Sequence, residues 1–136
     1  MPAYAHQATS AYRQTEVQSR TPLELVVMLY DGALRFMAQA SDAIKRKDIR
    51  ARRDAVSRTL TIISELQSTL DMEKGGVISE KLDALYVYIN GRLIEASSKQ
   101  DPRPIEEASR LMTTLRDSWA EVARETAATA PGRVTR

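Results

Sequence analysis

Apolar side chains recur at three- and four-residue spacing along most of this chain, which is the period of an α-helix. The pattern runs through four segments, at about 22–46, 49–72, 77–98 and 104–125. In the first segment the stripe consists of Val26, Leu29, Ala33, Phe36, Ala40 and Ile44. The chain has only five Gly and five Pro, and no run alternates polar and apolar residues as a strand would. The sequence therefore predicts an all-α protein with four long helices.

Local signals mark where these helices begin and end. Thr21 and Glu24 have the spacing of a capping box, and Pro22 occupies the first helical position, where its missing N–H costs nothing. The pair Gly75–Gly76 is a helix terminator, and the prolines within residues 99–104 stop one helix and start the next. The connections are short, and short links between long helices favour antiparallel neighbours.

The predicted architecture is an antiparallel up-and-down four-helix bundle over residues 21–126. Residues 1–20 are mostly small and polar, and we expect them to form an N-terminal arm. Residues 127–136 have low apolar content and predict a disordered tail. Gly32 and Gly91 fall inside predicted helices, where glycine costs about 1 kcal/mol relative to alanine. We expect each to permit the close approach of a neighbouring segment.

The composition excludes most catalytic chemistry. The single histidine, His6, falls in the predicted arm, and the chain has no cysteine. No glycine-rich phosphate loop and no cluster at metal-ligand spacing is present, so we expect no enzyme activity, metal or cofactor. No signal peptide is visible, and no run approaches the roughly 20 apolar residues that span a bilayer. A cytoplasmic protein without direct membrane insertion is the expectation.

Residues 45–58 form a basic segment with seven Lys or Arg and two Asp, although the whole chain carries a net charge of only +2. Asp48 within it predicts an N-cap for the second helix. One interpretation is a solvated helix face, and the other is a docking patch for an acidic partner. Base-stacking aromatic residues are absent from the segment, which argues against nucleic acid as that partner.

The first helix is apolar on more than one side, so it is either the centre of a bundle or one wall of a groove. A second stripe, beside the one already described, consists of Leu23, Val27, Tyr30, Leu34 and Met37. Tyr86 and Tyr88 lie two residues apart on the third helix, about 200° around its axis, and cannot both face one core. This arrangement favours a binding module with a groove. Two alternatives stay open: a regulatory bundle that binds nucleic acid or another acidic partner through residues 45–58, and a bundle that self-associates.

Several strings in the chain resemble the flagellar secretion chaperone family, FliS. The most specific is Met28–Phe36, MLYDGALRF, preceded by Thr21–Pro22. Further strings follow in the family's order and spacing: Leu85–Tyr88 with Arg92–Ala96, and then Leu115–Trp119. The resemblance covers about residues 11–125.

The resemblance implies a cytoplasmic chaperone of flagellar type III export. Such proteins bind the disordered C-terminal region of flagellin, prevent its premature polymerisation, and deliver it to the export gate protein FlhA. In some members the N-terminal segment covers part of the empty flagellin site, a role that falls here to the arm around Tyr12 and Val17. The residues expected to bind flagellin are Leu23, Val27, Tyr30, Leu34, Tyr86, Tyr88, Ile89 and Leu93.

Overall fold

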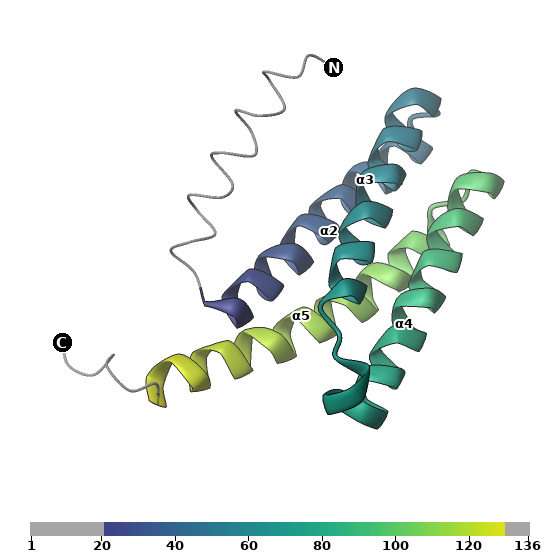
Figure 1. The fold of residues 1–136 in the computed structure, drawn as a ribbon. Helices are drawn as coiled ribbons and strands as arrows, with labels where there is room; N and C mark the ends of the chain where they lie inside the picture. The colour runs from purple at the N-terminus through teal and green to yellow at the C-terminus, as the bar shows by residue number, and fades with distance from the viewer. Residues whose placement is uncertain (1–20, 130–136) are drawn as a thin grey trace, which may run out of the picture.

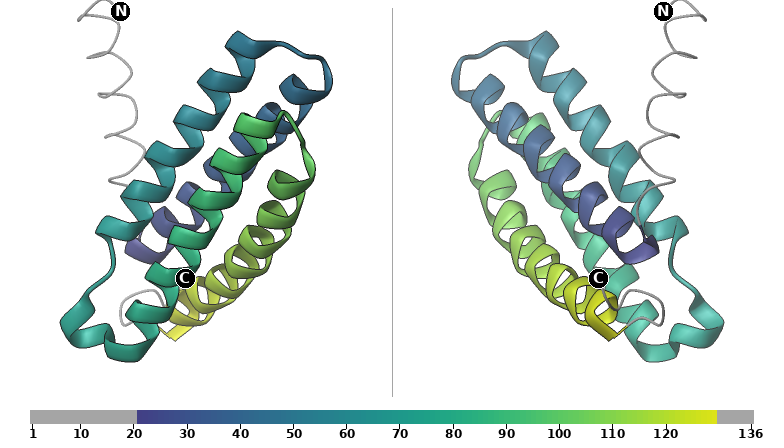
Figure 2. Two further views of the ribbon diagram at one scale, coloured as in Figure 1. Left: turned by 90° about the vertical axis from the view of Figure 1, so that its right-hand side faces the viewer. Right: turned by 90° about the vertical axis from the view of Figure 1, so that its left-hand side faces the viewer.

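The structure, a computed structural model, describes residues 21–129. It contains four helices, α2 (Pro22–Lys45), α3 (Ile49–Ser68), α4 (Met72–Lys99) and α5 (Arg103–Thr129). The helices alternate in direction and are joined by short turns (Figures 1 and 2). Helix α2 packs most extensively against α3 and α5, and α4 completes the ring between α3 and α5. The predicted up-and-down four-helix bundle is confirmed.

The predicted caps fix the starts of α2 and α3. The amide of Thr21 donates to the Glu24 carboxylate at 2.9 Å, and the amide of Glu24 donates to the Thr21 hydroxyl at 3.2 Å. Asp48 accepts from the amide of Ala51 at 3.0 Å. Caps of this kind contribute about 1 kcal/mol each, because they satisfy amides that have no partner within the helix.

The break between α3 and α4 falls at residues 69–71, because α3 ends at Ser68, earlier than the predicted Met72. The glycine pair, predicted to terminate a helix, instead lies within α4, which begins at Met72 and not near Val77. Asp71 caps a short turn that begins at Met72, and Gly76 then adopts a φ of +51° that kinks α4. A Cβ on Gly75 would lie 1.8 Å from the Ser79 hydroxyl oxygen. This connection therefore requires glycine at both positions, for two different reasons.

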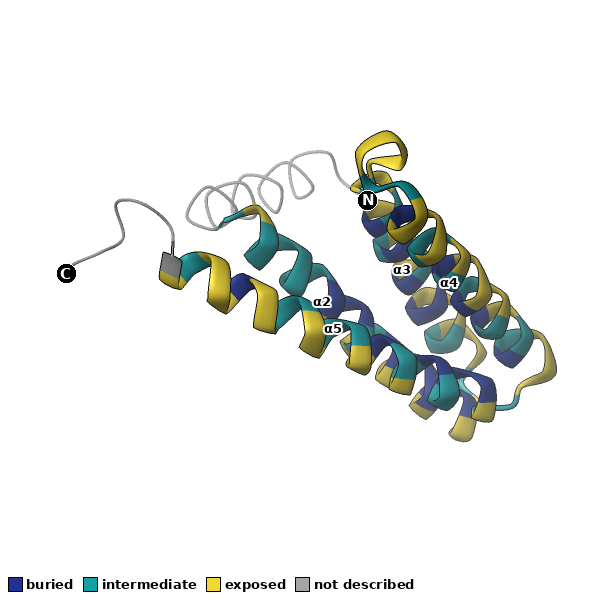
Figure 3. Cartoon of the chain, turned by 90° about the horizontal axis from the view of Figure 1, so that it is seen from below, coloured by how far each residue is buried: buried dark blue, intermediate teal, exposed yellow. Residues whose placement is uncertain are grey.

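The core lies where the stripes of all four helices meet, and Figure 3 shows the buried stretches facing inward. A Cβ on Gly32 would lie 3.2 Å from Ile62 Cδ1, so α2 and α3 approach closely there, as predicted. The same prediction is wrong for Gly91, whose Cβ would meet nothing within 4 Å. Gly91 is on the exposed side of α4, away from its packing partners. The largest fully buried side chains include Tyr30, Met37, Ile63, Leu66, Tyr86, Ile89, Leu93, Ile105 and Met112.

Helix α5 continues to Thr129, beyond both the predicted helix end at Glu125 and the predicted start of the tail at residue 127. The arm, with Tyr12 and Val17, and residues 130–136 lie outside the described residues.

Candidate functional site

One end of the bundle carries an apolar groove with a volume of about 530 Å³. Its walls come from the first two turns of α2, the α3–α4 connection, the start of α4, and one residue of α5. The apolar lining residues are Pro22, Leu23, Leu25, Val26, Leu29, Leu70, Ile78, Leu82, Tyr86 and Trp119. Such concave, mostly apolar surfaces are the usual form of a binding site.

Two local features of the sequence shape this groove. The capping box at Thr21 starts α2 at the groove's edge, so its first apolar residues, Leu23 and Val26, become one wall. The kink at Gly76 brings the start of α4, with Ile78 and Leu82, to the opposite wall. Both walls are therefore formed by the ends of helices, where neighbouring helices no longer cover the apolar side chains.

A pair of tyrosines lies beneath the groove. The hydroxyl oxygens of Tyr30 and Tyr86 are 2.5 Å apart, and their ring centroids are 6.4 Å apart with the rings tilted by 46°. Tyr30 has no exposed surface, and Tyr86, at 2% exposed, lines the groove floor. Burial raises the pKa of both hydroxyls above the ordinary value, so the pair is neutral at physiological pH. The floor of the groove is uncharged and its hydroxyls are already paired with each other.

Helix α4 also carries large apolar side chains on its exposed side, outside the groove. Ile78, at the start of this helix, lines the groove and is 70% exposed. Val77, Val87, Tyr88 and Ile94 are also exposed large apolar residues on α4. Several exposed apolar side chains on one helix are more than the scattered single residues that a surface normally shows. Tyr86 on the groove floor and Tyr88 on this exposed side lie about 200° apart around α4, so the groove and the exposed side are two separate apolar surfaces.

The ring of Tyr88 is held in place on this exposed side of α4 by a polar network. Its hydroxyl donates to the Glu107 carboxylate of α5 at 3.0 Å, and Arg92 Nε donates to the same carboxylate at 2.6 Å. These bonds lower the pKa of Glu107 and raise the pKa of Tyr88. Tyr88 therefore presents its ring outward while its hydroxyl is bonded.

The sequence-predicted site residues fall into three groups. Leu23 and Tyr86 line the groove, and Tyr88 is exposed on α4. Val27 and Leu34 are partly buried on α2. Tyr30, Ile89 and Leu93 have no exposed surface, so a ligand would reach them only if the bundle opened. The expectation that Tyr86 and Tyr88 do not share one core is confirmed.

Several groove and surface residues lie on the apolar helical stripes of the sequence. Val26, Leu29 and Trp119 follow these stripes, and each packs against the core and also lines the groove. Helical spacing places Val77 and Ile78 on the apolar stripe of the third helix, but both are more than half exposed. Helical periodicity identifies a face but not how far the neighbouring helix extends along it. In the sequence, the glycine pair is the feature that indicates a change of packing at the start of α4.

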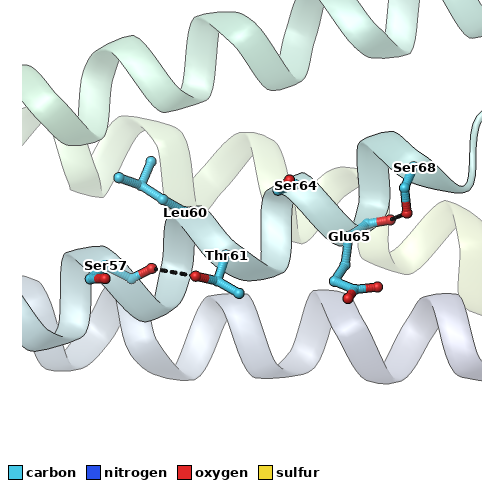
Figure 4. A pocket seen from close by; sticks show the side chains of 6 residues that line it. All are labelled: Ser57, Leu60, Thr61, Ser64, Glu65 and Ser68. Carbon is cyan, nitrogen blue, oxygen red and sulfur yellow. Dashed lines mark hydrogen bonds between the residues drawn. The ribbon is translucent and has the colours of Figure 1, made fainter.

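A second hollow, of about 430 Å³, lies on the surface of α3 (Figure 4). Its lining residues Ser57, Leu60, Thr61, Ser64, Glu65 and Ser68 all come from that one helix. The Thr61 hydroxyl donates to the Ser57 carbonyl at 3.0 Å, and the Ser68 hydroxyl donates to the Glu65 carbonyl at 2.6 Å. Two of its hydroxyl donors are already bonded to backbone carbonyls, and only one of its lining residues is apolar. A ligand would therefore find fewer contacts in this hollow than in the groove.

Other kinds of site find no support in the part of the chain that the structure describes. Residues 21–129 contain no group of three or more His, Cys, Asp or Glu side chains placed to hold a metal ion. None of the four described helices is long and apolar enough to cross a membrane.

Three of the strings that carry the family resemblance contact one another in the folded chain. Tyr30 of the first string bonds Tyr86 of the second, and Asp31 accepts from Arg116 Nε of the third at 2.8 Å. The family described as flagellar protein FliS matches residues 4–126, which include the groove and the exposed face of α4. The chain belongs to the FliS family.

Curated FliS proteins resemble this chain over most of its length. The flagellar secretion chaperone FliS of Campylobacter jejuni is 38% identical over 115 residues, covering 85% of this chain and 90% of the relative. The FliS of Bacillus subtilis is 34% identical over 82% of this chain and 83% of the relative. The FliS of Salmonella typhimurium is 33% identical over 88% of this chain and 92% of the relative. FliS membership supports a role in flagellar export, and such a role implies an export substrate as partner.

Proposed function

We propose that this FliS-family chain is a cytoplasmic chaperone that binds the disordered C-terminal region of flagellin, prevents premature polymerisation and delivers the subunit to the export gate protein FlhA. The observation that carries this proposal is the apolar groove at one end of the bundle, accompanied by large exposed apolar side chains on the outer side of α4. The relatives are flagellar secretion chaperones, which supports the export part of the proposal.

The shape and chemistry of these surfaces suit a segment that folds as it binds. An amphipathic segment has apolar side chains at helical spacing, and these need apolar counterparts spread along a surface. Each apolar side chain fully buried on binding contributes about 1.5–3 kcal/mol. Ordering a disordered segment costs about 2–5 kcal/mol, so several such anchors are needed. The groove and α4 together supply that number.

We assign the client contacts to the exposed and groove-lining members of the expected set, Leu23, Tyr86 and Tyr88, with Val27 and Leu34 beside them on α2. Tyr30, Ile89 and Leu93 then act indirectly, because they support these residues from the core. Ile78, Val87 and Ile94 join the proposed site because of their exposure.

The arm is proposed to compete with the client for the groove. Residue 20 joins Thr21 directly, and Pro22 and Leu23 line the groove. An extended chain spans at most about 3.6 Å per residue, so Val17 reaches about 14 Å from Thr21 and Tyr12 about 30 Å. Both side chains are therefore within reach of the groove. Deleting residues 1–18 should raise the on-rate for the client peptide or leave it unchanged, and a large loss of affinity would instead make the arm part of the binding site.

Titration calorimetry tests the function directly. The purified chain is titrated with a flagellin C-terminal peptide, with full-length flagellin, and with flagellin lacking that C-terminal region. The proposal expects near one-to-one binding of the first two and none of the third. Equal binding of all three flagellin forms would contradict it. A pull-down with the cytoplasmic domain of FlhA, with and without client, tests the delivery step separately.

A further inference from the structure

At the end of the bundle away from the groove, four cations have no ion-pair partner within residues 21–129. They are Lys47, Arg50, Arg52 and Arg53, which we call the unpaired patch. The other basic residues of segment 45–58 are neutralised: Lys45 pairs with Glu106 at 3.2 Å, Arg46 with Asp42 at 2.8 Å, and Arg58 with Asp54 at 2.9 Å.

The position of the patch is costly for the fold. Arg50, Arg52 and Arg53 lie at or next to the first turn of α3, which contains no acidic residue. The N-terminus of a helix carries a partial positive charge, so cations there are destabilising. Arg52 Nε is in addition buried without a hydrogen-bond partner among the described residues. Asp48 offsets part of this cost as the N-cap of α3, but none of the four cations pairs with it or with another carboxylate within residues 21–129. A local arrangement that departs from a stabilising rule in this way is typical of a functional surface.

We propose that the unpaired patch docks an acidic segment of a protein partner other than the client. Carboxylates would pair with the free guanidinium groups and would also relieve the repulsion at the helix N-terminus. The patch includes one apolar anchor, since Ile49 is 50% exposed and lies one helical turn from Arg53. An acidic segment with an interspersed apolar residue therefore fits it.

Nucleic acid fits the same patch less well. Carboxylates interrupt the cations, because Asp48 and Asp54 lie among them in the sequence. No aromatic residue stands in residues 45–58 to stack a base. Only four cations are free to neutralise phosphates, and affinity for a nucleic-acid backbone grows with that number.

The patch and the groove lie at opposite ends of α3. The groove begins at Thr69, just after the end of this helix, and the patch surrounds its start. Twenty residues of α-helix separate them, which is about 30 Å. Charges in solution are largely screened beyond about 8–10 Å at physiological salt. The two surfaces therefore work independently, and the chain can hold a client and an acidic partner at once.

The test uses the full chain and a fluorescent peptide in which glutamates alternate with leucines. The variant R50E/R53E reverses two charges of the patch. The matched control, K81E/R110E, reverses two exposed cations elsewhere that also have no ion-pair partner within residues 21–129. We expect the peptide to bind the native chain at low salt and R50E/R53E to weaken it at least about tenfold, with little change in the control. Melting should show R50E/R53E folded, and flagellin peptide binding should be unchanged in both variants.

Four results would overturn the proposal. The first is an equal loss in both variants, which would mean that only net charge matters. The second is no loss in R50E/R53E. The third is tighter binding of a single-stranded RNA oligonucleotide than of the peptide, with the RNA affinity lost in R50E/R53E. That result would assign the patch to nucleic acid. The fourth concerns a peptide with glutamine in place of glutamate, which should not bind. If this peptide bound as tightly as the glutamate peptide, charge pairing would be contradicted.

Discussion

The hydroxyl oxygens of Tyr30 on α2 and Tyr86 on α4 lie 2.5 Å apart, directly beneath the apolar groove. These helices are not neighbours in the chain, and the bond connects them through the core. It satisfies two polar groups that have almost no access to water. The two hydroxyls beneath the apolar groove therefore satisfy each other and leave the floor uncharged.

Removing both of these hydroxyls should cost less than the two single removals added together. Tyr30→Phe or Tyr86→Phe leaves the other hydroxyl buried without this partner, and each should lower the free energy of unfolding by about 1–3 kcal/mol. The double variant should cost less than the sum of the two singles. Urea unfolding of all four proteins measures this coupling. Additive effects would mean that the two hydroxyls do not depend on each other.

Alkaline pH should destabilise the native chain through the same pair. Burial raises the pKa of Tyr86 above that of an unfolded tyrosine, so the folded state retains its proton at a pH where the unfolded chain has lost it. The stabilising effect is present below about pH 10 and declines as pH rises above that value. Denaturant unfolding between about pH 8 and pH 11 should show a steeper decline for the native chain than for the double phenylalanine variant. Parallel curves would contradict the assignment to this pair.

The capping box should matter to binding as well as to stability. Thr21→Ala should cost about 1 kcal/mol of stability and should weaken client binding, because the first turn of α2 forms a groove wall. Asp48→Ala is the matched control: it removes the equivalent cap of α3 at the far end of the bundle. It should destabilise the chain to a similar extent without changing client affinity. Calorimetric titration of both variants, below their melting temperatures, separates the two effects.

The glycines of α4 should respond to alanine in opposite ways. Gly91→Ala should stabilise the chain by up to about 1 kcal/mol, because its Cβ meets no other atom and alanine favours the helix. Gly76→Ala should destabilise it by about 1 kcal/mol, because its φ is +51°. Thermal melting checks both. A stabilising Gly76→Ala would mean that the kink is not required.

Arg50→Glu should raise the melting temperature. It replaces a cation by an anion at the start of α3, which stabilises a helix by about 0.3–1 kcal/mol at low ionic strength. The gain should shrink with added salt, because salt screens the interaction. A melting series at low and high salt tests this, and a salt-independent change would exclude the helix dipole as its cause.

Much of the fold follows from local signals in the sequence. The period of apolar residues predicts the four helices, and Thr21 and Asp48 predict where two of them begin. The end of α3 is less predictable, since Leu70 continues its apolar pattern although the helix ends at Ser68. The pattern reports which residues are apolar, whereas the helix end depends on how Asp71 and the glycines fold the connection.

The groove is harder to predict than the bundle for a related reason. Val26, Leu29 and Trp119 follow the same helical stripes as core residues, and only the separation of the helix ends leaves them accessible. The third helix illustrates both outcomes. Tyr86 and Tyr88 were expected not to share one core, and only Tyr86 is buried, whereas Ile78 lies on the apolar stripe of this helix and is exposed. The pairing of Tyr30 with Tyr86 joins residues 56 positions apart, and no local pattern encodes that contact.

The most direct test of the groove as the flagellin site compares two equivalent substitutions at opposite ends of the bundle. Ile78→Asp places a charge on the groove wall, and Ile49→Asp makes the same change at an exposed isoleucine beside the unpaired patch. Each variant is titrated calorimetrically with the flagellin C-terminal peptide. The account predicts that Ile78→Asp loses at least about tenfold in affinity, which corresponds to about 1.4 kcal/mol, while Ile49→Asp binds like the native chain. Native affinity in Ile78→Asp, or an equal loss in both variants, would contradict the groove as the flagellin site.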